Sequence, residues 1–356
     1  MNNKNKSVIL CGPWDMGIQY REMPSVKGDD ILIKSTHTCI CATEVKYWYY
    51  GMPNVPDGTC VVQGHELAGI VADIGEDVKD KSLAEAKVAI DPSIWCGKCD
   101  MCVSGSPNLC RELKFMSLPP VDGGYQQYYT VPERNVHRIP DDMPLEWGTI
   151  AEPVNVGINA MSSAEKIIGS LSGKIIAVIG AGPQGLLLMQ TARAISDPEK
   201  VYVLEPLNYR LDLAKELGAD EIINPDTESP MEKIIDLTNG KGVDVTFEVS
   251  GDEKAYQLSA ELVKPGGTVI VVGIPTVQDH IPIKAITARR TGLTISFVRR
   301  FNPLDFPKAV DMIASGKVEV EKLITHRFPL DEITPAFEML HDYSDNVIKT
   351  IILPHD

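Results

Sequence analysis

The sequence predicts an α/β protein with two domains: an antiparallel, barrel-like β domain and a doubly wound parallel sheet. Up to about residue 155, short alternating segments such as 31–34 and 67–71 are separated by Gly, Pro and Asp, as in antiparallel sheets. From about 158 to 292, near-continuous apolar runs alternate with helical patterns, which is typical of a parallel sheet covered by helices. With 356 residues, the chain is long enough to bury two hydrophobic cores.

The parallel sheet is predicted from four apolar strands and the helices between them. The strands are expected over 175–179, 201–204, 243–247 and 268–272, with helices over 185–195 and 207–217. After 293 the pattern is mixed again, with a helix expected over 307–315. About 60 residues are few for a third domain, so we expect this tail to complete the first one. The predicted domains are 1–157, 158–292 and 293–356, of which the first and last form one unit.

Composition and charge argue against several kinds of partner. The net charge of −15 is unfavourable for binding a phosphate backbone. The longest apolar stretch, 175–192, contains three glycines and a proline, so we do not expect a membrane span. The apolar run near the start is too short for a signal peptide. We therefore expect neither nucleic acid nor a membrane as partner, and the cysteine usage described next favours a cytoplasmic protein.

Four cysteines stand close together with the spacing Cys-x2-Cys-x2-Cys-x7-Cys. They are Cys96, Cys99, Cys102 and Cys110. Four thiolates on a sharply turning backbone satisfy a tetrahedral zinc and leave no position for water, so the site is predicted to be structural. The alternative is a disulfide pair or four unrelated thiols. The metal-like spacing disfavours it, and the four remaining cysteines (Cys11, Cys39, Cys41 and Cys60) suit a reducing compartment better than a disulfide framework.

A glycine motif follows the first predicted strand of the parallel sheet and opens a helix. It comprises Gly180, Gly182, Pro183, Gln184 and Gly185. In this context the glycines permit a tight turn, close approach of the backbone to a pyrophosphate, and close packing of helix on strand. The pyrophosphate is expected at the helix N-terminus, where free N–H groups favour an anion. The segment Val272, Gly273 and Ile274 is also predicted to contact the dinucleotide that carries this pyrophosphate.

A carboxylate at the end of the second strand indicates which dinucleotide binds. Glu205 lies twenty residues after Gly185, where it would accept from the adenosine ribose hydroxyls and repel a 2′-phosphate. The sequence therefore predicts NAD rather than NADP. Arg210 is a nearby base that would weaken this preference; the alternative, which we favour, is that it lies on the helix surface.

A second group of candidate metal ligands combines a thiol, an imidazole and carboxylates. The residues are Cys41, His65, Glu66 and Glu152. Singly, none is specific, because lone cysteines are usually packed in a core and lone His-Glu pairs usually lie at the surface. Together they offer the mixed ligand set of a catalytic zinc that keeps a position open for water or substrate.

Taken in order and spacing, these motifs resemble the zinc-dependent medium-chain alcohol dehydrogenases over essentially the whole chain. Within that family, the chain is similar to the sorbitol (polyol) dehydrogenases through Tyr47-Trp48, residues 152–157 and 296–299, and residues 313–317 ahead of 325–328. The resemblance implies a GroES-like catalytic domain built from both chain ends, with a Rossmann domain inserted between them. It also implies two zinc ions per chain, NAD as cofactor, and a homotetramer or homodimer.

The resemblance also implies roles for individual residues. Cys41, His65 and Glu66 are expected to bind the catalytic zinc, with Glu152 a fourth ligand or a carboxylate that exchanges with water. Cys39 is a rival ligand, but only Cys41 gives the Cys-x-Thr step. Thr43 is expected to contact the substrate oxygen, and Glu44 to orient the histidine ligand. Lys46 stands where many relatives have a proton-relaying histidine. The residues expected to contact substrate are Tyr47, Phe115, Glu152, Arg299 and Arg300, the last in place of a tyrosine of sorbitol dehydrogenases.

The leading functional prediction is an NAD-dependent zinc dehydrogenase that converts a polyol or secondary alcohol to a ketose or ketone. A cyclitol, sugar or amino-alcohol (threonine-like) dehydrogenase on the same scaffold is the alternative. A catalytically inactive, NAD-sensing or structural relative belongs to another class. It should have lost a zinc ligand or the glycine motif, and this chain keeps them all.

Overall fold

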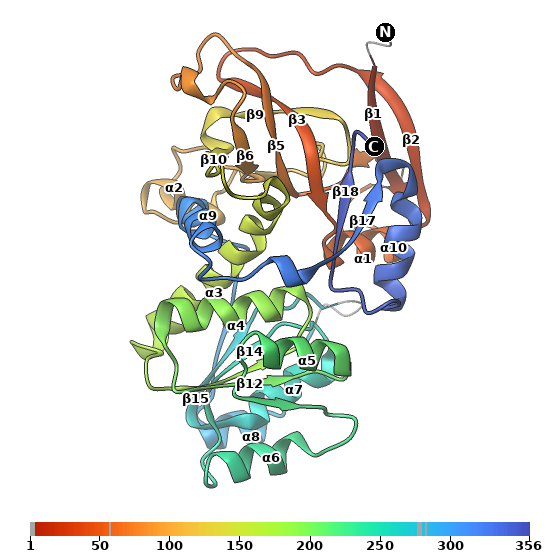
Figure 1. Cartoon of the computed structure of the whole chain (residues 1–356). Coiled ribbons are helices and arrows are strands. Elements are labelled where there is room, and N and C mark those ends of the chain that lie inside the picture. Colours follow the sequence, from red (N-terminus) through yellow and green to blue (C-terminus); the bar gives the residue numbers. More distant parts are fainter. Residues whose placement is uncertain (1–3, 57, 276–279, 282) are drawn as a thin grey trace. The chain divides into compact units, whose positions relative to one another are not determined.

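The computed structural model describes residues 4–56, 58–275, 280–281 and 283–356 (Figure 1). The chain divides into two compact units. The first comprises Met1–Asn155, Asn302–Gly316 and Val320–Asp356, and the second comprises Val156–Phe301 and Lys317–Glu319. Both ends of the chain therefore contribute to the first unit, as the fold class predicted.

The first unit is built on sheets whose described strand pairs are antiparallel, except for the parallel pair of β17 and β18. The largest sheet has the order β10-β6-β5-β3-β18-β17, and β9 also pairs with β3. Its strands are β3 (Asp30–Cys39), β5 (Glu66–Ile74), β6 (Lys87–Ile90), β9 (Tyr128–Pro132), β10 (Val136–Arg138), β17 (Ile324–Pro329) and β18 (Lys349–Leu353). The predicted barrel is not closed in the described part of the chain, because the strand order ends at β10 and β17.

Two smaller sheets and several short helices complete this unit. One sheet has the order β2-β1-β4 and the other pairs β7 with β8. Their strands are β1 (Lys4–Gly12), β2 (Asp15–Glu22), β4 (Val61–Val62), β7 (Ser93–Ile94) and β8 (Lys114–Phe115). The helices are α1 (Ala42–Tyr50), α2 (Asp100–Val103), α9 (Phe306–Ala314) and α10 (Ile333–Asp342), with 3-10 turns η1 (Lys81–Leu83), η2 (Pro107–Leu109), η3 (Glu133–Asn135), η4 (Leu145–Ile150), η5 (Pro303–Asp305), η6 (Glu321–Leu323) and η7 (Leu330–Glu332).

The second unit is a six-stranded sheet whose described pairs are all parallel, in the order β13-β12-β11-β14-β15-β16. This is the doubly wound order in which a dinucleotide binds where the strand order reverses. The strands are β11 (Ile175–Ile179), β12 (Lys200–Leu204), β13 (Glu221–Ile223), β14 (Val243–Glu248), β15 (Val263–Val271) and β16 (Thr294–Phe297). The helices are α3 (Ala151–Ile168), which starts in the first unit, α4 (Pro183–Ser196), α5 (Asn208–Glu216), α6 (Pro230–Leu237), α7 (Glu253–Leu262) and α8 (Ala285–Thr291).

One expectation about the cysteines is wrong. Cys11 and Cys60 form a disulfide, although the sequence favoured reduced thiols. The physical reason is strand register. Because Leu10 of β1 lies opposite Val61 of β4, antiparallel pairing brings the next residues, Cys11 and Cys60, side by side. The six other cysteines are free thiols.

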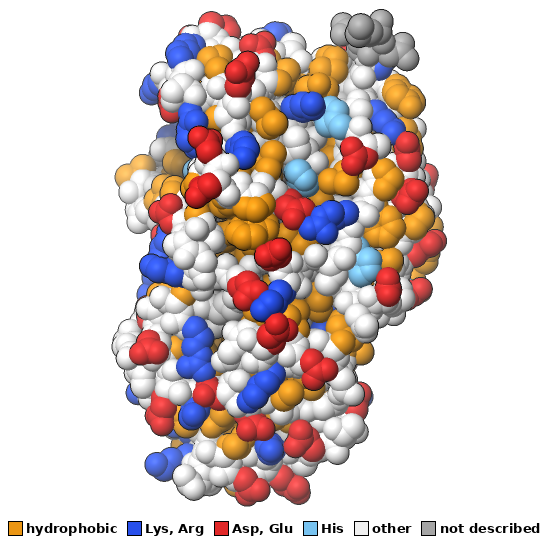
Figure 2. All heavy atoms as spheres, viewed as in Figure 1, with side chains coloured by type: hydrophobic (Ala, Val, Ile, Leu, Met, Phe, Trp, Pro, Cys, Tyr) orange, Lys and Arg blue, Asp and Glu red, His pale blue; other side chains and the backbone are white. Residues whose placement is uncertain are grey.

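The distribution of charged side chains on the surface and the length and polarity of the helices agree with the charge and hydropathy of the sequence. Described residues on the face seen in Figure 2 carry acidic and basic side chains interspersed with one another. Every helix in the described ranges is too short or too polar to cross a membrane.

Candidate metal centres and cofactor site

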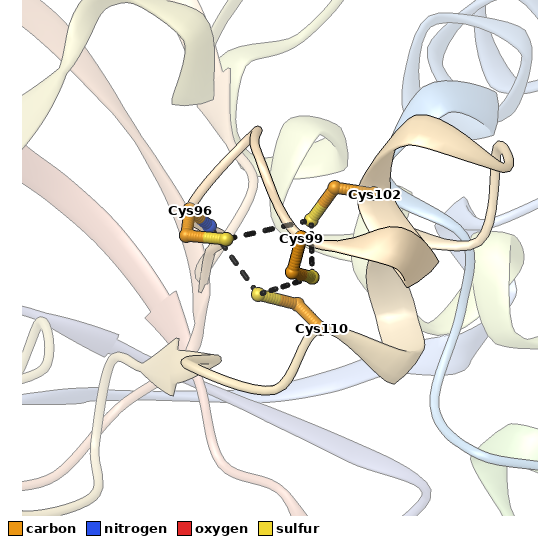
Figure 3. Close-up of side chains that lie close together, drawn as sticks. All are labelled: Cys96, Cys99, Cys102 and Cys110. Carbon is orange, nitrogen blue, oxygen red and sulfur yellow. Dashed lines mark hydrogen bonds between the residues drawn. The ribbon is translucent and has the colours of Figure 1, made fainter.

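The four clustered cysteines converge in one lobe of the first unit (Figure 3). Their sulfur atoms lie within 4.8 Å of one another, with Cys99 Sγ 3.5 Å from Cys102 Sγ and 3.9 Å from Cys110 Sγ. Tetrahedral zinc with Zn–S bonds of about 2.3 Å places its sulfur ligands about 3.8 Å apart. The arrangement therefore fits a zinc ion held by four thiolates.

The local backbone favours the thiolate of Cys99, whereas burial raises the pKa of the Cys102 thiol to about 12. Gly97 and Gly105 adopt positive φ angles of 76° and 83°, so the chain can turn between ligands. Backbone N–H groups of Arg111 and Cys102 donate to the Cys99 sulfur and lower the pKa of its thiol to about 6. The Cys96 N–H also donates to Cys110 Sγ at 3.3 Å. A closed set of four ligands supported in this way suits a structural zinc.

Strand pairing assembles the second group of candidate ligands. Ligand atoms of Cys41, His65 and Glu66 lie within 4.8 Å of one another. Because β3 and β5 are antiparallel, Glu66 lies opposite Cys39, and Cys41 follows two residues later at the start of α1. One thiol, one imidazole and one carboxylate leave a zinc coordination position open, as catalytic sites require.

Gly64 permits the close packing beside these ligands. Its φ is +99°, and a Cβ there would lie 2.8 Å from Thr38 Cγ2 and 2.9 Å from the Tyr125 backbone nitrogen. Only glycine fits this position without displacing the neighbouring chain. The sharp turn at Gly64 then directs His65 and Glu66 into the group.

Glu44 is fully buried and orients His65. Its Oε1 accepts from His65 Nδ1 at 2.7 Å and from the Gly64 N–H at 2.8 Å. Burial alone would raise the pKa of Glu44, but the charge and hydrogen bond of His65, with the Tyr125 hydroxyl and the Cys41 N–H, lower it. With Nδ1 donating to this carboxylate, the His65 Nε2 is available as the metal ligand. This is the geometry expected for the role predicted for Glu44.

Lys349 contributes a buried positive charge that the sequence analysis missed. Its Nζ contacts Glu66 Oε2 and donates to the Ile40 carbonyl at 3.2 Å. Burial acts to lower the pKa of Lys349, but Glu66 and the thiols of Cys39 and Cys41 raise it. A lysine inside the apolar segment 347–352 was the available signal in the sequence.

The rival ligand Cys39 stays outside the metal group. Its sulfur is buried and lies 3.1 Å from Thr149 Oγ1. Burial also raises the pKa of the Cys39 thiol to about 12.

The other predicted residues of the first unit lie on three elements. Thr43, Lys46 and Tyr47 share helix α1 and are half-buried. Phe115 is buried in β8, with its ring centroid 5.4 Å from that of His65. Glu152 is buried in the first turn of α3 and is not part of the group that Cys41, His65 and Glu66 form within the described residues.

The glycine motif in the second unit has the expected strand-turn-helix context. β11 ends at Ile179, Gly180 has φ +103°, and α4 begins with Pro183 after Gly182. A Cβ on Gly185 would lie 1.9 Å from the Gly180 carbonyl oxygen, so only glycine fits there. Gly185 thus lets α4, a helix of 14 residues, pack closely on the turn after β11, and the N-terminus of α4 lies where a pyrophosphate is expected.

Glu205 is buried and braces the glycine loop. Its Oε2 accepts from the Ala181 N–H at 2.7 Å, and its Oε1 accepts from the Leu207 N–H at 3.3 Å. Arg210 Nη1 lies 3.9 Å from Glu205 Oε1. The expectation that Arg210 lies on the helix surface is wrong, because its side chain is 9% exposed and turns back toward this carboxylate.

The remaining predicted residues of the second unit follow its last two strands. The Val272 and Gly273 N–H groups donate to the Glu248 carbonyl at 2.8 and 3.0 Å, and Ile274 is exposed. Arg299 is exposed and Arg300, at φ +51°, is half-buried. Asn159 fixes this turn by donating to the Arg300 carbonyl at 2.9 Å.

Comparison with known proteins decides the family. Residues 27–141 match the alcohol dehydrogenase GroES-like domain, and residues 183–315 match the zinc-binding dehydrogenase domain. A sorbitol dehydrogenase of Bacillus subtilis is 31% identical over 98% of this chain and 97% of its own length. The chain belongs to the zinc-dependent medium-chain alcohol dehydrogenases. It is therefore an oxidoreductase that uses zinc and a nicotinamide cofactor.

Other members of the family match over comparable lengths. A sorbitol dehydrogenase of Arabidopsis thaliana is 33% identical over 95% of this chain and 92% of its own length. A solved oxidoreductase/dehydrogenase of unknown specificity from Escherichia coli is 30% identical, with a TM-score of 0.90 over 98% of this chain and 99% of that one. A structure from Sinorhizobium meliloti, described as a zinc-binding dehydrogenase and solved with NADP bound, is 28% identical, with a TM-score of 0.88 over 99% of both chains.

Proposed function

We propose that this dehydrogenase oxidises a polyol or secondary alcohol with NAD and yields a ketose or ketone, NADH and a proton. The observation that carries the proposal is the three-ligand group of Cys41, His65 and Glu66, which leaves a zinc position open. Likeness over nearly the whole chain to proteins named sorbitol dehydrogenase supports a polyol as the substrate class.

Each residue predicted for the catalytic site has a proposed task. Zinc, when bound, supplies a Lewis acid that lowers the pKa of the substrate hydroxyl. The Thr43 hydroxyl takes up the alcohol proton, because a hydroxyl can accept and donate at once. Lys46 lies three residues later on α1 and is proposed to be near the proton's exit. Glu152 is proposed as an exchangeable fourth ligand. Phe115 beside His65 is proposed to exclude water from the reacting carbon.

The cofactor is proposed to bind on the second unit. NAD, when bound, supplies the hydride acceptor. The start of α4 would hold its pyrophosphate, and Glu205 would accept from the adenosine ribose. We propose that Val272, Gly273 and Ile274 contact the same cofactor, and that Tyr47, Arg299 and Arg300 contact the substrate.

Three further proposals concern the whole protein. A cytoplasmic location is proposed from the free thiols at all five cysteines proposed as zinc ligands, although the Cys11–Cys60 disulfide is of a kind that is rare in the cytosol. A homotetramer, or a homodimer, is proposed from the family resemblance. We keep 1–157 with 293–356 as the proposed catalytic domain and 158–292 as the proposed NAD domain.

A substrate panel tests the proposed function. Polyols, simple secondary alcohols, cyclitols, sugars and amino alcohols are supplied with NAD, and the absorbance of the reduced cofactor is followed. We expect the highest kcat/KM for a polyol, and no activity in the Cys41→Ser variant. Preference for a cyclitol, sugar or amino alcohol would establish the alternative substrate class. A wild-type protein that holds zinc at both sites but reduces NAD with none of these compounds would contradict the proposal.

A further inference from the structure

We infer that Tyr125 is a positioning residue for the catalytic zinc, acting through Glu44 on the histidine ligand. The Tyr125 hydroxyl donates to Glu44 Oε2, while the other oxygen of the same carboxylate accepts from His65 Nδ1 at 2.7 Å. The inference rests on the proposed function, in that Cys41, His65 and Glu66 hold the zinc. It assigns a task to a residue that neither the glycine motif nor the ligand set contains.

The two oxygens of Glu44 have separate partners. Oε1 accepts from His65, from the Gly64 N–H and from Ser117 Oγ at 3.0 Å. Oε2 accepts from the Tyr125 hydroxyl and from the Cys41 N–H at 3.2 Å. The terminal torsion of a glutamate has a broad energy minimum, so its rotation must be fixed from outside. The phenol holds Oε2 and thereby aims Oε1 at His65.

Tyr125 itself is held rigidly, as a positioning residue must be. Its N–H donates to the Gln63 carbonyl at 2.9 Å, and its carbonyl accepts from the Val8 N–H at 2.8 Å. Its fully buried ring packs edge-on against Phe337, with centroids 6.0 Å apart, in a core cluster of the first unit. The hydroxyl therefore extends from a fixed core position to the fully buried Glu44.

The chemistry of the contact explains why it affects the metal. A hydrogen bond from a neutral hydroxyl to a buried carboxylate is charge-assisted and strong. Carboxylates that accept from a ligating histidine fix its tautomer and ring orientation, and loss of such support typically lowers metal affinity by about 10–100-fold. Since Glu44 keeps its other donors when the phenol is removed, we expect an effect at the lower end of that range.

Tyr129 provides a matched control. It is also buried, and it lies four residues further along the chain in β9. Its hydroxyl has no hydrogen-bond partner among the residues that the structure describes. Tyr125→Phe and Tyr129→Phe thus remove the same atom from comparable surroundings, but only the first removes a bond to Glu44. Ser117→Ala removes a second side-chain donor to Glu44, at Oε1 instead of Oε2. It therefore tests whether hydrogen bonds to the other carboxylate oxygen also support zinc binding.

The test measures zinc retention in the full-length holoprotein against increasing chelator, with the zinc of the four cysteines as internal reference. We expect Tyr125→Phe to release one zinc at about 10-fold higher free-zinc concentration than wild type, that is, at a lower chelator concentration. It should keep the other zinc unchanged, with Ser117→Ala shifted in the same direction and Tyr129→Phe unshifted. After cobalt is substituted at the catalytic site, the thiolate-to-cobalt absorption band should shift in Tyr125→Phe but not in Tyr129→Phe.

Several results would overturn the inference. Equal zinc retention in Tyr125→Phe, Tyr129→Phe and wild type would overturn this inference but not the proposed function. Parallel loss of both zinc ions with a lowered Tm would also overturn it, because that is the mark of general destabilisation. A wild-type protein that holds zinc only at the four cysteines would overturn the proposed function and this inference together.

Discussion

Lys349 and Glu66 form a buried ion pair beside the candidate catalytic zinc site. Lysine Nζ contacts Glu66 Oε2, and the two side chains are 4% and 2% exposed. β18 pairs with β3, where Ile351 lies opposite Cys39, so the last strand of the chain brings Lys349 next to a proposed zinc ligand. The first unit thus depends on both chain ends for charge balance as well as for packing.

Replacing Lys349 should be costly when zinc is absent. Lys349→Met leaves the Glu66 carboxylate buried without a counter-charge, which typically costs about 3–5 kcal/mol. Zinc binding should recover part of this loss, because the metal then compensates the carboxylate. Urea unfolding with and without zinc measures the loss of stability and the part of it that zinc recovers. Lys6→Met is the control, since Lys6 pairs with Asp331, whose side chain is 54% exposed. If the two variants lost the same stability, the buried pair would have no special role.

Two zinc ions per chain should respond separately to mutation. Cys99→Ser should lower Tm strongly, because a structural zinc contributes folding free energy. Cys41→Ser should abolish activity and remove one zinc while leaving the fold, as followed by metal analysis and circular dichroism. A single zinc in pure wild-type protein would disprove the two-site assignment.

Asp91 should make the protein less stable as the pH rises. Burial, and to a lesser degree the charge of Glu152, raises the pKa of Asp91 to about 8, against hydrogen bonds from Ser93. An unfolded chain releases this proton near pH ~4. Between these pH values the folded state binds more protons, so stability falls from about pH 4 to about pH 8. Asp91→Asn should therefore raise Tm at pH 8 and have a smaller effect at pH 5. A Tm difference independent of pH would contradict this.

Local patterns predicted the fold class and the four-cysteine group, because each depends on short stretches of sequence, whereas the roles of Cys41, His65 and Glu66 came from the family resemblance. The strands β11, β12, β14 and β15 were predicted from their apolar runs. β13 has three residues and β16 has four, of which two are polar, so both were missed. The Cys11–Cys60 disulfide, the Lys349–Glu66 pair and the Tyr125–Glu44 contact join distant segments. Strand register determines the first two, and a single sequence does not reveal it.

The charge on Glu205 should determine the choice between NAD and NADP. Glu205→Gln keeps an acceptor for the Ala181 N–H but removes the charge that would repel a 2′-phosphate, so KM for NADP should fall while KM for NAD changes little. Glu205→Ala also removes the brace on the glycine loop, so it should raise KM for NAD about 10-fold or more. Steady-state kinetics with both cofactors measure this. Equal use of NAD and NADP by the wild type would refute the role given to Glu205.

Arg299 should distinguish polyols from simple alcohols. We propose that its guanidinium donates to two neighbouring substrate hydroxyls at once, a task that suits its planar fork. A site built to bind hydroxyl groups rejects analogues that lack them, because its donors are left unpaired. Arg299→Ala should therefore raise KM for a polyol about 10-fold or more, and KM for a plain secondary alcohol much less.

Two comparisons separate this role from a structural one. Arg289 lies exposed on α8 in the same unit, so Arg289→Ala should leave both KM values unchanged. Arg300→Ala removes the neighbouring charge, and its effect on polyols should be smaller, since Arg300 is half-buried in a turn that Asn159 fixes. An equal rise in KM for the polyol and the secondary alcohol in Arg299→Ala would mean that the residue supports the fold or a subunit contact. The assignment of a polyol would then lose its main residue-level support.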